Sequence, residues 1–311
     1  MRILFLGAGA TGGYFGGRLA KAGADVTFLV RPKRRDQLAR DGIRIRSAAG
    51  DITTPVAAIT QDEITAPFDA IIVTAKAYDL ASAIETIRPA VGPTSLILPL
   101  LNGLKHLDDL DQAFGRPRIL GGTCHISTVL EEDGTIRHLG HFASLTLGPR
   151  LSEQKAGSAR LHDDLVRGGF DVRHSDDVIG AMWEKWVLLA TLAGSTCLMR
   201  ASIGEIVRSH SGRQFILDML DECCAVAAAS GHPPRSAAMS AAKTTLTDPQ
   251  SDISASMLRD IERGGRIEAD HIIGDLIARG RQHGVPTPLL EVANIHLEAY
   301  QIRLAAGTRS G

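Results

Sequence analysis

Short apolar runs alternate with amphipathic segments through the first half of the chain. They predict helices at 14–22 and 80–87 among strands at 2–6, 25–30, 43–46, 52–59, 69–74 and 95–99. Strands that alternate with helices are typical of a doubly wound parallel sheet. Later runs at 118–130, 135–139 and 144–148 predict further strands, with a hairpin turn at Asp133-Gly134.

The pattern changes near residue 175, where strand-like runs stop. Long amphipathic helices are predicted from there on, at 177–193, 212–230, 235–246, 266–283 and 288–304. We therefore predict an α/β N-terminal domain with a Rossmann-type doubly wound sheet over 1–174, and an all-α C-terminal domain over 175–311.

The composition fits a globular protein whose partner is a small molecule. Hydrophobic residues make up 44% of the 311 residues, and the formal net charge of −1 gives no overall field that favours nucleic acid or an anionic membrane. No apolar run reaches the roughly 18 residues of a membrane helix, and no signal-peptide pattern is visible. Neither cysteines nor histidines show metal-binding spacing, so we expect no metal site and a cytoplasmic location.

The first strand ends in a glycine-rich turn, Gly7-Ala8-Gly9-Ala10-Thr11-Gly12. This G-x-G-x-x-G lies between a strand and a helix, which is the setting of the dinucleotide-binding fingerprint. We expect Gly7 to form the tight turn, Gly9 to let the backbone approach a pyrophosphate, and Gly12 to let helix and strand pack closely. The helix N-terminus would offer its free N–H groups to the phosphates. The alternative is a βα turn with incidental glycines.

The second strand ends in cations rather than a carboxylate. Sites that prefer NAD usually carry an acidic residue here, whereas this chain has Arg31-Pro32-Lys33-Arg34-Arg35. Because a guanidinium binds phosphate through two parallel hydrogen bonds, we assign Arg31 to the 2′-phosphate of NADP. Lys33, Arg34 and Arg35 are candidates for further contacts, and a solvated basic loop is the alternative.

Several polar residues stand where chemistry could take place. Lys76 and Asn102 follow two strands whose carboxyl ends should lie at one sheet edge, where open α/β sheets bind ligands; a surface lysine and an Asn-Gly turn would look the same. Lys185 precedes an uncharged run at 187–199. Partial burial would lower its pKa and suit it to proton donation, unless it extends to water. Ser256 and Glu268 could equally be surface residues or caps.

Together these residues resemble the ketopantoate reductase (2-dehydropantoate 2-reductase) family over nearly the whole chain. Besides Arg31, the resemblance rests on G-A-G-A-T-G-G at 7–13, V-T-A-K-A at 73–77, L-N-G at 101–103, W-E-K at 183–185, and S-M-L-R-D followed by G-R-I-E-A-D between 256 and 270. It implies a Rossmann domain, a helical domain and a site in the cleft between them.

The resemblance also implies a reaction: NADPH-dependent reduction of 2-dehydropantoate to (R)-pantoate, a step of pantothenate and CoA biosynthesis. Lys185 would be the general acid, and Glu268 its supporting carboxylate and a contact of substrate and cofactor. The substrate would also be bound by Asn102, Ser256 and Lys76. The other cofactor contacts would be Lys76, Asn102, Gly7, Gly9, Ala10, Thr11, Gly12 and Arg31.

The chain departs from the family at four positions. Typical members carry asparagines, most of them substrate contacts, where this sequence has Leu189, Ala193, Ile203 and Ile273. Each lost amide would weaken a hydroxylated substrate by about 1–3 kcal/mol, unless Thr191, Ser195 or Thr196 replaces it.

Two other functions therefore stay open. The first is an NAD(P)-dependent 2-hydroxy acid dehydrogenase of the same fold that acts on a more apolar 2-oxo acid. The second is a non-catalytic NADP-binding regulator, which would not need a proton donor such as Lys185. The apolar helices fit either a core or a subunit interface, so a homodimer also stays open.

Overall fold

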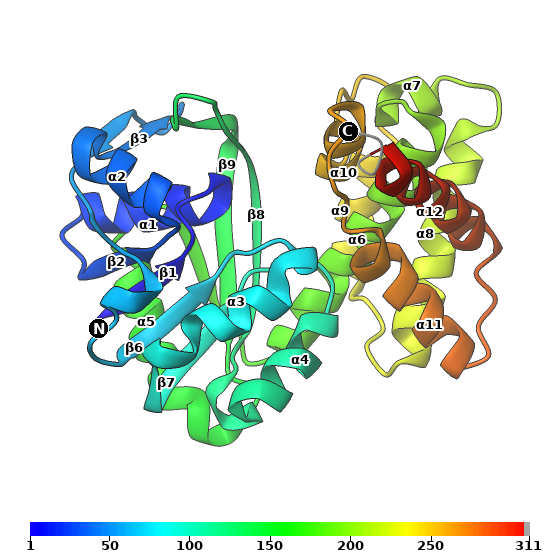
Figure 1. Cartoon of the computed structure of the whole chain (residues 1–311). Helices are drawn as coiled ribbons and strands as arrows, with labels where there is room; N and C mark the ends of the chain where they lie inside the picture. The colour runs from blue at the N-terminus through cyan, green and yellow to red at the C-terminus, as the bar shows by residue number, and fades with distance from the viewer. Residues whose placement is uncertain (308–311) are drawn as a thin grey trace. The chain divides into compact units, whose positions relative to one another are not determined.

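The computed structural model describes residues 1–307 and divides the chain into two compact units (Figure 1). The first comprises Met1–Leu101 and His106–Val178, and the second comprises Asn102–Lys105 and the chain from Ile179 onward. The segment Asn102–Lys105 follows a strand of the first unit in sequence, yet its contacts group it with the second.

The first unit is built on a five-stranded parallel sheet, which confirms the predicted fold class. Its strands lie in the order β5-β2-β1-β6-β7. They are β1 (Ile3–Leu6), β2 (Val26–Leu29), β5 (Ala57–Ile59), β6 (Phe68–Val73) and β7 (Val91–Pro99). The chain order reverses between β1 and β6, and in open α/β sheets ligands bind beyond the carboxyl ends of the strands at such a switch point.

Five helices belong to this part of the chain: α1 (Ala10–Lys21), α2 (Pro32–Asp41), α3 (Leu80–Ile87), α4 (Lys105–Phe114) and α5 (Lys155–Val166). Helix α2 occupies the basic segment, where no helix was predicted and a solvated loop was the alternative to a phosphate contact. Pro32 stands at its first position, and Gly42, with φ of 67°, ends it. Helix α4 was not predicted either. Five short 3₁₀ turns complete the helical segments, at Gln61–Glu63, Ala77–Asp79, Arg88–Ala90, Arg116–Arg118 and Ser152–Gln154.

A second sheet in this unit was only partly foreseen. It contains β3 (Ile43–Arg46), β4 (Ile52–Thr54), β8 (Gly121–Leu130), β9 (Ile136–Gly148) and β10 (Asp171–His174). The predicted strand 52–59 is two strands, β4 and β5, that belong to different sheets. The predicted strands 135–139 and 144–148 are one strand, β9, with an irregularity opposite Ile126–Thr128. The hairpin turn at Asp133-Gly134 is confirmed, and Gly134 has the left-handed φ of 81°.

Helix α1 lies between the two sheets because four of its residues have no side chain. A Cβ on Gly16 would lie 2.7 Å from the Phe28 ring of the first sheet, and one on Gly17 would lie 2.9 Å from Ile45 of the second. Gly12 and Gly13, one turn earlier, face the same two sides. Glycine weakens a helix interior by about 0.5–1 kcal/mol per residue. Burial of α1 between two apolar surfaces offsets that cost.

The second unit is all-helical, as predicted (Figure 1). The predicted helix 266–283 begins only at Asp270, with a π-helical turn, and the short helix α7 was not foreseen. The helices are α6 (Val178–Met199), α7 (Ile203–Val207), α8 (Gly212–Ala229), α9 (Ser236–Leu246), α10 (Ser256–Glu262), the π turn η6 (Asp270–Gly274), α11 (Asp275–Gln282) and α12 (Pro288–Gly307).

Helix α6 forms much of the core of this unit. Trp183 and Trp186 are almost fully buried, and Gly194 allows close contact with Met219 of α8 and Ala293 of α12. A helix that is apolar on nearly all sides is expected to be buried in this way. None of the described helices is both long enough and apolar enough to cross a bilayer.

The Glu184–Arg235 ion pair joins α6 to the start of α9. The carboxylate of Glu184 accepts hydrogen bonds from the Arg235 backbone N–H at 3.0 Å, from Nε at 2.7 Å and from Nη2 at 2.6 Å. These hydrogen bonds lower the pKa of Glu184. A carboxylate whose pKa is lowered by folding stabilises the protein above its unfolded-state pKa, and this contribution is lost as the pH falls through the folded-state value.

We therefore expect Glu184→Gln to lower the free energy of unfolding by about 1 kcal/mol or less at pH 7, since Arg235 is largely exposed. The difference from the parent protein should shrink below the usual glutamate pKa of about 4.3. Urea unfolding at pH 7, 5 and 3.5 measures it, with the exposed Glu262→Gln as control. A difference that does not change with pH would contradict this account.

Candidate active site

The glycine-rich turn between β1 and α1 has the geometry that its spacing predicts. Gly7 adopts the left-handed φ of 90° in the tight turn. A Cβ on Gly12 would lie 2.7 Å from the Gly7 carbonyl oxygen, so only glycine allows α1 to start this close to the strand. At Gly9, by contrast, no atom lies within 4 Å of a Cβ position. The turn therefore leaves space beside the backbone at Gly9, where a pyrophosphate would approach.

Thr74 supports this turn and was missed by the sequence reasoning. Its hydroxyl donates to the Leu6 carbonyl oxygen at 3.1 Å and lies against Gly12. Thr74 thus joins the carboxyl ends of β1 and β6 at the switch point. A polar residue directly after a buried apolar strand was the signal that could have identified it. Lys76 follows two residues later, half-buried at the start of a 3₁₀ turn.

The four cations after β2 have different environments. Arg34 donates to the carbonyl oxygens of Ala8 and Gly134, and Arg35 pairs with Asp36 and Glu63. Arg31 and Lys33 are exposed, and within residues 1–307 their side chains form no hydrogen bond or ion pair. Of the four cations considered for a 2′-phosphate, Arg31 and Lys33 are thus the two whose charge no protein group engages.

In the helical unit the structure brings Asn102 and Lys185 together. The Lys185 ammonium donates to the Asn102 side-chain oxygen at 3.1 Å, although the two residues lie 83 positions apart. Both side chains are half-buried. Gly103, with φ of 75°, lies so close to the π turn η6 that a Cβ would be 2.7 Å from the His271 carbonyl oxygen. This contact fixes the Asn102-Gly103 turn on the helical unit.

Glu268 precedes the same π turn and is 7% exposed. Its carbonyl oxygen accepts from the backbone N–H groups of His271 and Ile272 at 3.2 and 3.1 Å. Trp186, the neighbour of Lys185, donates its indole N–H to the Ile272 carbonyl oxygen at 2.9 Å. The segments that carry Asn102, Lys185 and Glu268 are therefore all fastened to η6, and π turns occur frequently at functional sites.

Ser256 is the first residue of α10 and is half-buried. Its position depends on Thr196 of α6, whose hydroxyl accepts from the preceding Ala255 N–H at 3.3 Å and donates to the Leu192 carbonyl oxygen at 2.7 Å. Thr196 therefore fixes the start of α10 rather than offering a free hydroxyl. The hydroxyls of Thr191 and Ser195 are likewise buried and bonded within the protein, to the Val187 carbonyl oxygen and the Met219 sulfur.

The positions where the family has asparagines are mostly core positions in this structure. Ala193, Ile203 and Ile273 are fully buried, and Leu189 is half-buried. The thiols are equally unsuited to chemistry, since burial raises the pKa of Cys197 and of Cys223 to about 12. Of the four polar side chains of this unit that the sequence singled out, Asn102, Lys185, Ser256 and Glu268, a hydrogen bond joins Asn102 and Lys185.

Family models match both units. The ketopantoate reductase PanE/ApbA model matches residues 3–151, and the model of the C-terminal part of the same proteins matches residues 177–301. The chain belongs to the ketopantoate reductase family. As a member of this family it is an oxidoreductase that acts on a CH–OH group.

Relatives match along nearly their full length. An uncharacterized oxidoreductase of Bacillus subtilis, YkpB, is 34% identical over 301 residues, which cover 97% of this chain and 99% of that protein. The solved ketopantoate reductase of Geobacter metallireducens is 30% identical, with a TM-score of 0.88 and coverage of 96% and 99%. D-mandelate dehydrogenase, solved with NADH and anilino(oxo)acetate, reaches a TM-score of 0.88 at 22% identity, over 98% of this chain and all of that one, and so shares the fold.

Gly9 and Gly12 of the glycine turn should respond differently to an added methyl group. We expect Gly12→Ala to lower stability by about 1–3 kcal/mol, because the Gly7 carbonyl must move. Gly9→Ala should change the free energy of unfolding by no more than about 0.5 kcal/mol, since its Cβ would contact no atom within 4 Å. The same variant should nevertheless weaken dinucleotide binding at least about tenfold. Thermal melts and NADPH fluorescence titrations measure both effects.

Gly140→Ala, whose methyl group would make only an ordinary van der Waals contact with the Phe142 backbone nitrogen at 4.0 Å, is the control. Undiminished NADPH binding by Gly9→Ala would show that the turn does not hold the pyrophosphate.

Proposed function

We propose that this protein reduces 2-dehydropantoate to pantoate with NADPH, and that Lys185 is the general acid. The observation that carries the proposal is the Lys185–Asn102 hydrogen bond of 3.1 Å, formed in a chain that matches the ketopantoate reductase family through both units. An ammonium group held by an amide oxygen, with a buried carboxylate on a neighbouring segment, is suited to give a proton to a carbonyl oxygen.

The residues of the glycine turn fit a nicotinamide dinucleotide. Gly9 leaves the backbone accessible, α1 begins at Ala10, and Arg31 and Lys33 are available for a phosphate at the end of β2. Thr11 stands in the first turn of α1, where free N–H groups favour an anion. Lys76 follows the neighbouring strand β6 and is proposed to contact both cofactor and substrate. When bound, the cofactor supplies the hydride.

In the proposed reaction a C–H bond forms at C2 of the 2-oxo acid while the C=O double bond becomes a single bond. Negative charge grows on the carbonyl oxygen, and Lys185 neutralises it by transferring a proton from Nζ. A cation already in place lowers this barrier without having to reorganise. Lys185 then regains a proton from solvent. Asn102 orients the ammonium, Glu268 supports its charge, and Ser256 binds the polar end of the substrate.

We expect Lys185→Ala to lower kcat about a hundredfold or more, the range in which a general acid contributes. The dissociation constant of NADPH should stay within about twofold, because the proposed cofactor contacts lie elsewhere. Steady-state kinetics and a binding titration test this. The matched control is Lys243→Ala, which removes an exposed lysine of the same unit. Near-native turnover by Lys185→Ala would refute the acid assignment.

Leu189, which stands half-buried at one of the family's asparagine positions, favours a second candidate, a dehydrogenase for a more apolar 2-oxo acid. We expect NADPH to support turnover of 2-dehydropantoate at a higher kcat/KM than phenylglyoxylate or 4-methyl-2-oxopentanoate. A panel of these three acids with NADPH and with NADH measures both preferences. A kcat/KM at least about tenfold higher for either apolar acid would establish the second candidate instead.

A further inference from the structure

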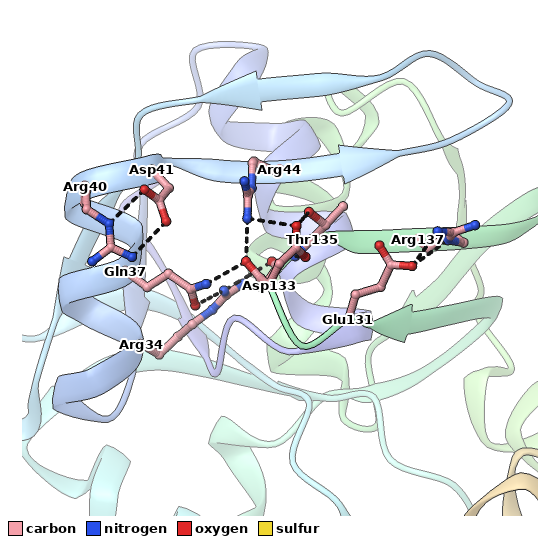
Figure 2. A network of polar contacts seen from close by, with 10 residues as sticks. Arg34, Gln37, Arg40, Asp41, Arg44, Glu131, Asp133, Thr135 and Arg137 are labelled. Atoms are coloured by element: carbon pink, nitrogen blue, oxygen red, sulfur yellow. Dashed lines mark hydrogen bonds and ion pairs between the residues drawn. The ribbon is translucent and has the colours of Figure 1, made fainter.

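One arginine of the basic cluster connects three parts of the first unit. Arg34 of α2 donates to the Ala8 carbonyl oxygen twice, from Nε at 3.2 Å and from Nη2 at 3.0 Å. Its Nη1 donates to the Gly134 carbonyl oxygen at 3.2 Å and to Gln37 Oε1 at 2.7 Å. Figure 2 shows this side chain directed from α2 toward the turn between β8 and β9. The guanidinium thus links the glycine turn to a hairpin that is remote in sequence.

The contact with Ala8 determines how the next N–H group points. The Ala8 carbonyl and the Gly9 N–H belong to one planar, trans peptide unit, so they point in opposite directions. The fork of Arg34 therefore turns the Gly9 N–H away from α2. Within residues 1–307 this N–H donates to no protein acceptor, and a Cβ built on the same residue would meet no atom within 4 Å. It is thus presented to whatever binds there.

The β8–β9 turn, which the Arg34 guanidinium contacts at Gly134, is held by further hydrogen bonds. Gln37 Nε2 donates to the Asp133 carbonyl oxygen at 2.7 Å, and Arg44 donates to the Asp133 carboxylate at 3.2 Å (Figure 2). That carboxylate also accepts from the Thr135 N–H at 2.9 Å and from the Thr135 hydroxyl at 3.0 Å. Gly134 has no room for a side chain, because Gln37 and Arg34 occupy the space. The Arg34 guanidinium therefore packs directly against the hairpin turn at Gly134.

The environment of Arg34 separates it from the exposed Arg31. Burial, and to a lesser degree the nearby Arg44, lower the pKa of Arg34 from its usual value, although a guanidinium stays charged at neutral pH. Four of its five N–H groups already donate to protein acceptors. An arginine in this state has little capacity left to bind a phosphate directly, whereas the Arg31 side chain has all its donors available.

We propose that Arg34 is a positioning residue for the pyrophosphate of the dinucleotide, acting through the Ala8–Gly9 peptide, and that it takes no part in recognising the 2′-phosphate. The inference rests on the proposed nucleotide site. It assigns different tasks to two arginines three residues apart: Arg31 distinguishes NADPH from NADH, and Arg34 serves both equally.

The test is direct binding of NADPH, NADH and 2′-AMP, without any 2-oxo acid, so that a wrong substrate assignment leaves the measurement intact. We expect Arg34→Ala to weaken the binding of NADPH and of NADH by the same factor, about tenfold. This is the size expected when hydrogen bonds to a charged group are lost. Binding of 2′-AMP, which lacks the pyrophosphate, should not change. Arg31→Ala should weaken the binding of NADPH and of 2′-AMP but leave the binding of NADH unchanged.

Arg35→Ala is the matched control, since it removes the adjacent arginine, which does not contact the glycine turn. Arg34→Lys keeps the charge but not the fork, so it should recover little of the loss and also serves if Arg34→Ala does not fold. Amide hydrogen exchange of the nucleotide-free protein should accelerate at residues 7–12 in the Arg34 variants and not in Arg35→Ala. The proposal is overturned if Arg34→Ala weakens the binding of NADPH but not that of NADH, or if it leaves the binding of both dinucleotides unchanged.

Discussion

The close approach of α1 to two sheets is the constraint on which the first unit depends. Gly12 and Gly16 let the helix pack against the parallel sheet, and Gly13 and Gly17 let it pack against the second sheet. Because Gly13 lies against Ile136, the first residue of β9, the same packing brings the β8–β9 turn near the glycine turn at the carboxyl end of β1. The glycine turn is consequently fixed from both sides, and its N–H groups are arranged before any ligand arrives.

In the helical unit, segments that carry polar side chains are held in place by contacts with the backbone of η6. Its polar groups come from the start of α6, from the Asn102-Gly103 turn and from the segment before η6. Gly103 and Trp186 both meet the backbone of η6, so the loop that follows β7 is held by the helices. A π turn exposes backbone carbonyls that a regular helix would use internally, and here the Trp186 indole N–H satisfies one of them.

The features of the fold that depend on residues close together in the sequence could be predicted. The alternation of strands and helices predicted the parallel sheet. The spacing of Gly7, Gly9 and Gly12 between a strand and a helix predicted the turn, since each glycine has a role that depends on its immediate neighbours. The basic segment was harder to interpret, because Pro32 and Gly42 could have indicated helix α2 but the run of cations was interpreted as a phosphate contact or a solvated loop. The contacts of Arg34 could not be predicted, because one of them is made to a hairpin turn 100 residues away in sequence. The Lys185–Asn102 contact has the same long-range origin: the positions could be singled out, but not their meeting.

The distribution of polar groups also bears on which acid the proposed reaction accepts. The hydroxyls of Thr191, Ser195 and Thr196 are used within the protein, and Ala193 and Ile203 contribute no polar group. In the proposed reaction, recognition of the carboxylate and the carbonyl would fall to Lys76, Asn102, Lys185, Ser256 and Glu268, which would treat every 2-oxo acid alike. Discrimination between side chains would then depend on apolar contact, which is worth only about 1–3 kcal/mol per methylene group. A site of this kind selects by size and shape more than by hydrogen bonding, so a hydroxyl on the substrate side chain would have to be recognised by groups outside α6.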